Sequence, residues 1–411
     1  MVPASFSLVR RAVLSALVVL AVVVLASACA SSSPESPSQP FELSLRFSLA
    51  GGEEATKCVY ARVPGAPGEE VFLRGGLHEL SPGAHHYLVY RTTVTEWRDD
   101  MTVPFECGEH DGAMRGVTTY VTGGQAARAN ADFPSAAALP LRGGEILLVQ
   151  GHFLNASPAA TDASVRVVLR LVGPSAVEHR AGLLRYYDPF IFVPPRGKAS
   201  AQMRCTLERD IVMLSAGAHM HARGVHYEAY IDKPGEPRAT TPFFTSDDWL
   251  HPSFFLGFER LPAGTSIRFR CDYASDRDEP VVQGLSAARD EMCMFNAFYY
   301  PAMEPGEEIC ADMHEVGNGQ ASCVDTVACL DRCPLTDRPD FASGSPYVGA
   351  CWQKCVVDSC PGASAALFPL LTCADAKCRA ECAAPGEACR ACAAAKCATE
   401  QAACVSSTCA P

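Results

Sequence analysis

The sequence predicts an all-β protein made of two antiparallel, jelly-roll-like β-sandwich domains, followed by a small disulfide-rich helical module at the C-terminus. Most of the chain consists of short alternating or apolar segments separated by Gly, Pro, Asn and Asp, which is typical of antiparallel sandwiches. A break rich in proline near residue 189 divides these segments into two sets, and the composition changes to Ala and Cys after residue 311. A chain of 411 residues is long enough for two or three domains with separate cores.

The N-terminus has the pattern of an export signal. Two arginines precede an apolar run over residues 12–26, which is too short to be kept as a membrane span, and small residues then lead to Cys29. A small-residue run that ends in Cys resembles a bacterial lipobox, although Ala26 stands where Leu is more common. We therefore expect a signal peptide over residues 1–28, lipidation of Cys29, a flexible tether over 29–40 and anchoring of an exported protein to the membrane of the cell envelope. The alternative is ordinary cleavage after a site like Ala-x-Ala.

The strand signals define two domains of similar size. We place the first over residues 41–183 and the second over 184–310. The expected strands include residues 41–45, 86–90, 145–149 and 165–169 in the first domain and 212–214, 227–231, 266–270 and 295–300 in the second.

Residues 311–411 form a Cys-rich module with two repeated units. Fourteen of the 21 cysteines lie here, and those three or four residues apart lie on one face of a helix, where facing pairs would link helical hairpins. Without Cys29 an even number of cysteines remains, which predicts ten disulfides in an oxidising compartment. Zinc binding by the Cys clusters is the alternative. The net charge of −12, without a block of Lys or Arg, argues against nucleic acid as a partner.

Histidine motifs suggest a metal site. His219 and His221 end an apolar strand, so they share one face about 7 Å apart, and Met220 between them should point into the core. His152 also ends an apolar strand. His85 and His86 are adjacent, so both can bind one ion only at a strand end or a bulge, or by using different ring nitrogens. Imidazoles together with a thioether, here that of Met292, suit copper that cycles through a reduced state.

Four motifs follow one another along the chain: His85-His86, the strand-end His152, His219-x-His221 and Asp290-Glu291-Met292-Cys293. In this order they resemble the motifs of the copper type II ascorbate-dependent monooxygenase family over about residues 41–310. The resemblance implies two copper ions per chain, with ascorbate or a similar electron donor. It places one copper on His85, His86 and His152 as an electron store. It places the other, where O2 binds, on the catalytic residues His219, His221 and Met292. It implies hydroxylation of a C–H bond of a small-molecule substrate.

The same resemblance pairs six cysteines whose connectivity the residues alone leave open. The implied disulfides are Cys58–Cys107, Cys205–Cys310 and Cys271–Cys293.

Three departures from the peptide-hydroxylating members of the family concern the substrate. Those members bind the substrate carboxylate with an Arg where this chain has Gly217, and they carry Asn and Tyr where it has Met294 and Asn296. We therefore expect a hydrophobic or aromatic small molecule in place of a peptide. We expect Asp290 and Glu291 to be solvated turn residues; the alternative is that they hydrogen-bond copper-bound histidine.

A non-enzymatic alternative also fits the sequence. In it, the chain is a copper-binding or surface-interaction lipoprotein that binds a partner through the Cys-rich tail. The remaining histidines, His78 among them, are expected to be structural or at the surface.

Overall fold

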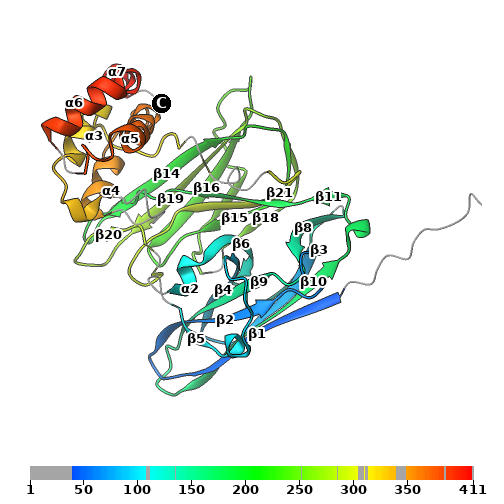
Figure 1. Cartoon of the computed structure of the whole chain (residues 1–411). Helices are drawn as coiled ribbons and strands as arrows, with labels where there is room; N and C mark the ends of the chain where they lie inside the picture. Colours follow the sequence, from blue (N-terminus) through cyan, green and yellow to red (C-terminus); the bar gives the residue numbers. More distant parts are fainter. Residues whose placement is uncertain are drawn as a thin grey trace, which may run out of the picture.

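The computed structural model describes residues 39–107, 112–134, 136–250, 252–284, 286–303, 310, 313–338, 349–383 and 386–409. Strands account for 45% and helices for 18% of the structure. Figure 1 shows a first β unit, a second β unit and a helical C-terminal module in succession. The predicted β-rich body and the helical, disulfide-rich C-terminal region are confirmed. The proposed signal peptide, Cys29 and most of the tether lie outside the described residues.

The first β unit consists of two sheets that enclose one core. In one sheet the order is β1-β10-β3-β8-β11, with β7 paired to β3, and in the other it is β5-β2-β9-β4-β6. Alternation explains the packing: Val165, Val167 and Leu169 of β10 are buried, whereas Arg166 between them forms an ion pair with Glu42. The elements are β1 (Gln39–Leu49), β2 (Glu54–Arg62), β3 (Glu70–Leu80), β4 (Ala84–Thr92), η1 (Asp99–Thr102), β5 (Phe105–Glu106), α2 (Gly112–Arg115), β6 (Val117–Gly124), β7 (Arg128–Asp132), β8 (Ala137–Arg142), β9 (Ile146–Leu154), β10 (Thr161–Val172), η2 (Pro174–Ala176) and β11 (His179–Arg180).

The second β unit repeats this plan. One sheet has the order β12-β21-β15-β18, the other has β14-β19-β16-β17, and β13 pairs with β20. Its core contains large buried side chains from both sheets, among them Tyr227, Phe269, Phe295 and Tyr299. The strands are β12 (Gly182–Tyr187), β13 (Phe192–Val193), β14 (Lys198–Thr206), β15 (Ile211–His219), β16 (Gly224–Asp232), β17 (Phe244–Ser246), β18 (Phe254–Leu261), β19 (Ser266–Ala274), β20 (Val281–Val282) and β21 (Met294–Tyr300).

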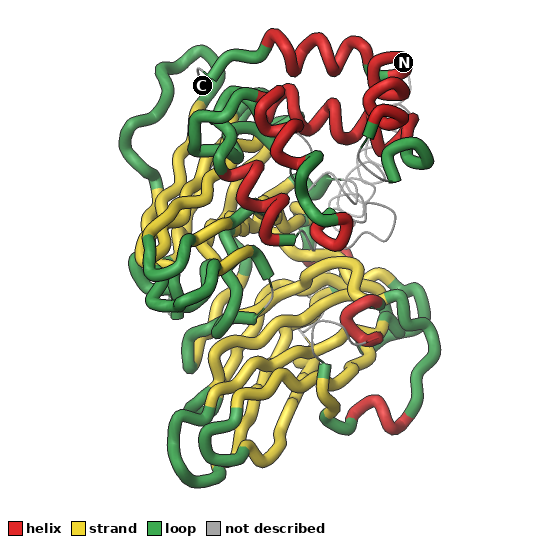
Figure 2. Tube along the Cα trace, turned by 90° about the vertical axis from the view of Figure 1, so that its left-hand side faces the viewer, coloured by secondary structure: helices red, strands yellow, loops and turns green. Residues whose placement is uncertain are grey.

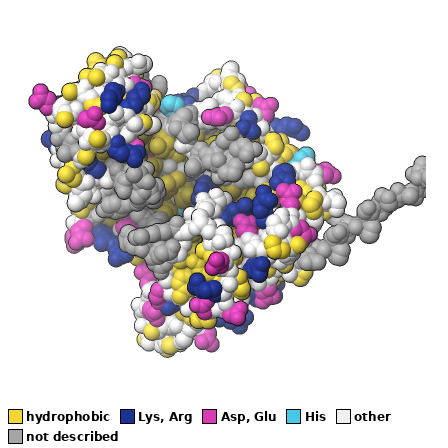
Figure 3. Space-filling model, in the orientation of Figure 1, with side chains coloured by type: hydrophobic (Ala, Val, Ile, Leu, Met, Phe, Trp, Pro, Cys, Tyr) yellow, Lys and Arg dark blue, Asp and Glu magenta, His cyan; other side chains and the backbone are white. Residues whose placement is uncertain are grey.

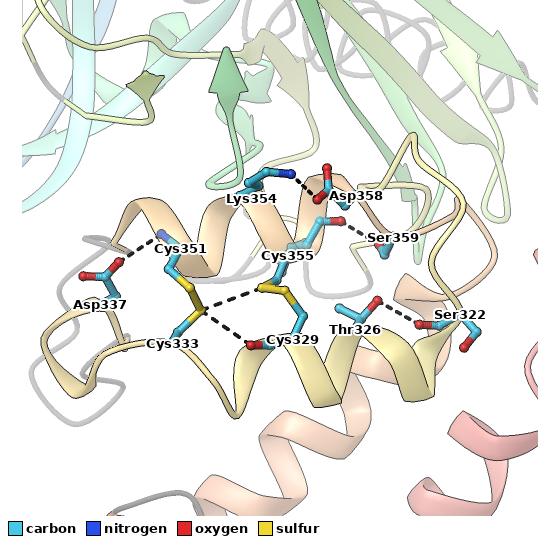
Figure 4. Close-up of a disulfide and its surroundings, with 11 residues drawn as sticks. Ser322, Thr326, Cys329, Cys333, Asp337, Cys351, Lys354, Cys355, Asp358 and Ser359 are labelled. Atoms are coloured by element: carbon cyan, nitrogen blue, oxygen red, sulfur yellow. Dashed lines mark hydrogen bonds and ion pairs between the residues drawn. A yellow bond between two sulfur atoms is a disulfide. The ribbon is translucent and has the colours of Figure 1, made fainter. Parts of the chain in front are cut away.

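The C-terminal module is a group of short helices held together by disulfides. In the second Cys repeat the pairs are nested: Cys373–Cys397, Cys378–Cys392 and Cys382–Cys389. In the first repeat only the two inner pairs, Cys329–Cys355 and Cys333–Cys351, follow this rule, and Figure 4 shows them between α3 and α4. The outer cysteines pair with the end of the chain instead, as Cys323–Cys404 and Cys360–Cys409. The helices are α3 (Cys323–Leu330), η3 (Leu335–Asp337), α4 (Ala350–Val357), α5 (Ser364–Cys378), α6 (Glu387–Lys396) and α7 (Ala398–Ser406).

The module packs against the second β unit, and the two share one hydrophobic core. Figure 2 shows the helices gathered beside one of the two groups of strands. Phe190 stacks on Phe368 with ring centroids 5.4 Å apart. The buried amide of Gln353 accepts hydrogen bonds from the backbone N–H groups of Ile191 and Gln283. The second β unit and the C-terminal module are therefore packed together as one structural unit.

Figure 3 shows acidic and basic side chains interspersed over the visible face. Within the described residues, none of the helices combines the length and the apolar character that crossing a membrane requires.

Candidate metal centre

Three histidines of the first β unit converge at the edge of one sheet. His86 of β4 lies opposite His152 of β9, and the pairing of β4 with β9 is irregular between Ala84 and His86. Adjacent residues of a regular strand point to opposite faces, and this bulge allows His85 and His86 to turn toward the same point. The Nδ1 atom of His85 lies 3.2 Å from Nδ1 of His152 and 2.9 Å from Nδ1 of His86. The structure therefore brings together all three predicted ligands of the first site.

This donor set fits a copper ion. Burial, together with the neighbouring His85 and His152, holds the pKa of His86 well below its ordinary value, which favours the neutral imidazole that binds metals. Three ring nitrogens within 4.8 Å of one another can be satisfied jointly by one cation. Imidazole nitrogen is a ligand that copper prefers.

Glu54, which sequence analysis missed, orients one of these histidines. Its Oε1 lies 2.8 Å from Nε2 of His152, so that Nδ1 of His152 is the nitrogen that faces the other two rings. A carboxylate on the outer nitrogen of a metal-binding histidine is a common supporting contact. The contact arises because β2 pairs with β9, and no local motif around Glu54 signals it.

The second group of predicted ligands lies at the end of β15. The rings of His219 and His221 have centroids 5.1 Å apart, and both line one cavity together with Met292. Burial lowers the pKa of His219 to about 4, and burial and the neighbouring His219 hold the pKa of His221 well below its ordinary value. Both imidazoles are thus neutral and able to bind a metal. Met220 is 1% exposed and lies in the hydrophobic core, as the alternation of the strand predicts.

The prediction that Glu291 is a solvated turn residue is wrong. Glu291 is completely buried, and its carboxylate accepts hydrogen bonds from the backbone N–H groups of His221, at 3.0 Å, and Arg223, at 2.6 Å. Burial raises its pKa to about 7, against the opposing effect of these hydrogen bonds. The sequence shows only an acidic pair before Met292, whereas the fold inserts Glu291 beneath the turn that follows His221.

Asp290 supports the same histidine through its backbone. The carbonyl oxygen of Asp290 lies 3.2 Å from Nδ1 of His221. The Nε2 atom of the same ring therefore points away from Asp290. The Asp290 carboxylate accepts a hydrogen bond from the N–H of Ser286. The sequence left open that Asp290 hydrogen-bonds a metal-binding histidine. Asp290 makes such a contact to His221 through its backbone carbonyl group and not through its carboxylate.

The two histidine groups face each other across one cavity, which we call the cleft. The cleft has a volume of about 770 Å³ and lies between β2, β4, β6 and β9 on one side and β12, β15, β18 and β21 on the other. The ring centroids of His86 and His219 are 6.2 Å apart. Trp249, from the segment between β17 and β18, packs on His85 with ring centroids 4.7 Å apart, and sequence analysis missed this contact between the β units.

The cleft is apolar where the peptide-hydroxylating relatives carry an Arg. Phe254 of β18 lies opposite Gly217, and a Cβ atom at position 217 would meet its ring at 2.7 Å. Phe254 is 61% exposed and lines the cleft, so it can contact a ligand there. Met294 and Asn296 line the cleft with Met292, as their spacing predicts. The position of the missing Arg is thus covered by an aromatic ring.

The disulfides agree with the resemblance. The three pairs that it implies, Cys58–Cys107, Cys205–Cys310 and Cys271–Cys293, are present among ten disulfides. The cysteines of the C-terminal module are also bonded to one another, which leaves no thiolate for the alternative of zinc binding. Outside the clusters, His78 is buried and lies 3.0 Å from the carbonyl oxygen of Ala126, in a structural role.

The fold and the site define a β-rich, disulfide-stabilised protein with two histidine groups that face one cleft. Residues 180–321 match the C-terminal domain of copper type II ascorbate-dependent monooxygenases. Tyramine beta-hydroxylase of Caenorhabditis briggsae is 25% identical over 257 residues, which cover 56% of this chain and 42% of that protein. The family-model match and this relative both support the copper type II ascorbate-dependent monooxygenase family, with the family model confined to the second β unit and the residues that follow it. The chain spans less than half the length of this relative.

Two solved structures have a weak likeness to the chain. The major capsid protein P2 of bacteriophage PM2 has 9% identity and a TM-score of 0.23, with 64% of this chain and 97% of that chain covered. A structure of the infectious bursal disease virus Gx strain has 10% identity and a TM-score of 0.17, with 67% and 76% covered. TM-scores this low bear on neither fold nor function.

Proposed function

We propose that the chain hydroxylates a C–H bond of a small organic substrate with O2 and an ascorbate-type donor, using two separate mononuclear copper sites. The observation that carries this proposal is that both histidine groups face one cleft of about 770 Å³, large enough for a small molecule. In the overall reaction R–H, O2, two electrons and two protons give R–OH and water. Bound copper supplies the one-electron redox chemistry and the activation of O2.

Each group of residues has a defined task in this proposal. His85, His86 and His152 hold the electron-storing copper, and Glu54 keeps His152 in the tautomer that leaves Nδ1 free. His219, His221 and Met292 hold the copper at which substrate reacts. Two rigid contacts orient this second set: the Asp290 carbonyl fixes the ring of His221, and the buried Glu291 carboxylate fixes its backbone. A thioether ligand favours the reduced metal.

The cleft favours a substrate with a hydrophobic or aromatic body. Phe254 and Met294 present apolar surface beside His219, and Gly217 provides no charge to bind the end of a peptide. Apolar walls exclude water from the reacting C–H bond and bury the substrate.

We propose further that each β unit is a jelly-roll-like sandwich, because each has two sheets around one core.

Export and anchoring through Cys29 complete the proposal. The ten disulfides support an oxidising compartment. Mass spectrometry of the membrane fraction tests the anchor, since a diacylglycerol-modified Cys29 should form the mature N-terminus. A mature protein that begins at any other residue would contradict it.

Copper stoichiometry together with oxygen uptake tests the enzymatic proposal. We expect two copper ions per chain and ascorbate-dependent consumption of O2. His219→Ala should leave one copper, on His85, His86 and His152, and abolish substrate hydroxylation. His226→Ala, which removes a histidine outside the cleft, is the control and should retain both ions. A wild-type protein with a single copper, or with no O2 uptake over a broad substrate panel, would refute the proposal.

A further inference from the structure

An arginine that has no counter-ion among the described residues lies inside the cleft. Arg185 of β12 lines the cleft, and its Nε atom is buried without a hydrogen-bond partner. Across the described residues, no ion pair or hydrogen bond engages the Arg185 guanidinium. An arginine stays charged under all ordinary conditions, and leaving its donors unsatisfied in a partly buried site is costly. The position therefore suits an anion that is supplied from outside the chain.

The strand register places Arg185 relative to the second histidine group. Arg185 lies opposite Asn296, Asn296 lies opposite Gly217, and Gly217 lies opposite Phe254, so these four residues form one row across the sheet. His219 is two residues further along β15 than Gly217. Strand geometry thus separates the Cα atoms of Arg185 and His219 by about 7 Å along the strands and about 10 Å across them.

Two tyrosines of the opposite sheet lie at the same end of the cleft. Tyr90 of β4 and Tyr120 of β6 line it, with ring centroids 6.2 Å apart. Burial raises the pKa of both phenols, and the Arg185 guanidinium is close enough to oppose that shift. Tyr90 shares the face of His86 but is four residues away, about 13 Å along the strand. The cleft thus has a metal-binding end and a cationic, phenolic end.

Among the described residues that line the cleft, no carboxylate compensates this cationic end. The Glu54 carboxylate is engaged by His152 at the metal-binding end. Arg289, the other arginine that lines the cleft, has an exposed side chain. An ammonium group near Arg185 would meet a like charge, whereas a carboxylate would meet a guanidinium and phenolic O–H donors.

We propose that Arg185, with Tyr90 and Tyr120, binds a carboxylate group of the substrate. The apolar body of the substrate then lies along Phe254 and Met294 and reaches toward His219. This inference rests on the proposed function and specifies its substrate class as an elongated aromatic or apolar carboxylate. Peptide-hydroxylating relatives carry their carboxylate-binding arginine at the position of Gly217. Here the cation stands in the same row, two strands away.

Titration calorimetry on the full chain tests this assignment, in both the copper-free and the copper-loaded protein. The probes are 4-phenylbutanoate, its neutral amide 4-phenylbutanamide and the amine 4-phenylbutylamine. We expect the carboxylate to bind about ten-fold or more tighter than the amide, since hydrogen bonds to charged groups contribute more than neutral ones. The amine should bind more weakly than the amide.

Arg185→Gln should abolish the preference for the carboxylate and leave the affinity for the amide unchanged, which also shows that the cleft is intact. Arg185→Lys should keep part of the preference, because it retains the charge without the planar fork. Arg289→Gln, in the same cleft, is the matched control and should behave as wild type.

Three results would overturn the assignment. The first is equal affinity of the wild type for the carboxylate and the amide, and the second is a preference for the carboxylate that survives Arg185→Gln. The third is that Arg185→Gln weakens the binding of ascorbate, itself an organic anion, while carboxylate binding persists, because Arg185 would then bind the reductant. Loss of the two-copper stoichiometry would refute the proposed function separately, because the copper-free titration does not depend on metal.

Discussion

The imidazole rings of His86 and His219 meet edge to face with their centroids 6.2 Å apart, although β4 and β15 belong to different β units. The packing of Trp249 on His85 adds a second contact between the units at the same place. The two groups of predicted ligands therefore face each other directly, with the cleft extending away from them toward Arg185.

This proximity predicts magnetic interaction between two Cu(II) ions. We expect the fully loaded oxidised protein to give an electron paramagnetic resonance signal that dipolar interaction broadens relative to that of two isolated ions. His219→Ala should restore the sharp signal of one isolated Cu(II), because it empties the second site. A wild-type spectrum equal to the sum of two isolated centres would show that the units separate in solution.

The two methionines near the His219 motif should respond differently to the same substitution. Met292→Leu should lower retention of Cu(I), measured by competition with a Cu(I) chelator, since it removes the soft thioether ligand. Met220→Leu should keep Cu(I) binding and change the free energy of unfolding by less than about 1.5 kcal/mol, because it conserves volume in the core. Equal Cu(I) affinity of the wild type and Met292→Leu would exclude Met292 as a ligand.

Glu54→Gln should weaken copper binding at the first site. The carboxylate fixes His152 through Nε2, and loss of such a contact costs about 10- to 100-fold in metal affinity. Titration of the His219→Ala background, which isolates the first site, measures the effect. Glu106→Gln removes an exposed carboxylate of β5 outside the cleft and should leave the affinity unchanged. An undiminished affinity in Glu54→Gln would show that the contact does not support the metal.

The buried Asp188 should make the second β unit less stable as the pH rises. Burial raises its pKa well above the ordinary value, and the backbone N–H of Phe190 donates to its Oδ1 at 2.9 Å. The folded state therefore binds the Asp188 proton more tightly than the unfolded state. This destabilisation is absent below the unfolded pKa of about 4. Between the unfolded and the folded pKa, the free energy of unfolding falls by about 1.4 kcal/mol for each pH unit.

Asp188→Asn keeps the acceptor for Phe190 and cannot ionise. Urea unfolding at pH 4 and pH 7 should show the variant gaining stability relative to wild type as the pH rises. Asp278→Asn, at an exposed carboxylate, should show no such gain. A constant difference between Asp188→Asn and wild type at the two pH values would contradict the burial argument.

Features that depend on a local pattern of residues could be predicted from the sequence. The period-2 alternation located the strands that carry His86, His152 and His219, and it sent Met220 into the core, because successive side chains of a strand point to opposite faces. The order of the four motifs pointed to the family. The even cysteine count predicted ten disulfides, but the repeat did not reveal that Cys323 bonds to Cys404 and Cys360 to Cys409.

Contacts between chemical groups of distant segments followed from the packing of the folded chain. Glu54 reaches His152 through strand pairing, Glu291 is buried beneath a turn, and Phe254 covers the position of a missing Arg. Arg185 enters the cleft because β12 joins the sheet of β15 by way of β21. Such contacts join segments far apart in the chain, so their geometry follows from sheet order and from the packing of the β units, which no local pattern records.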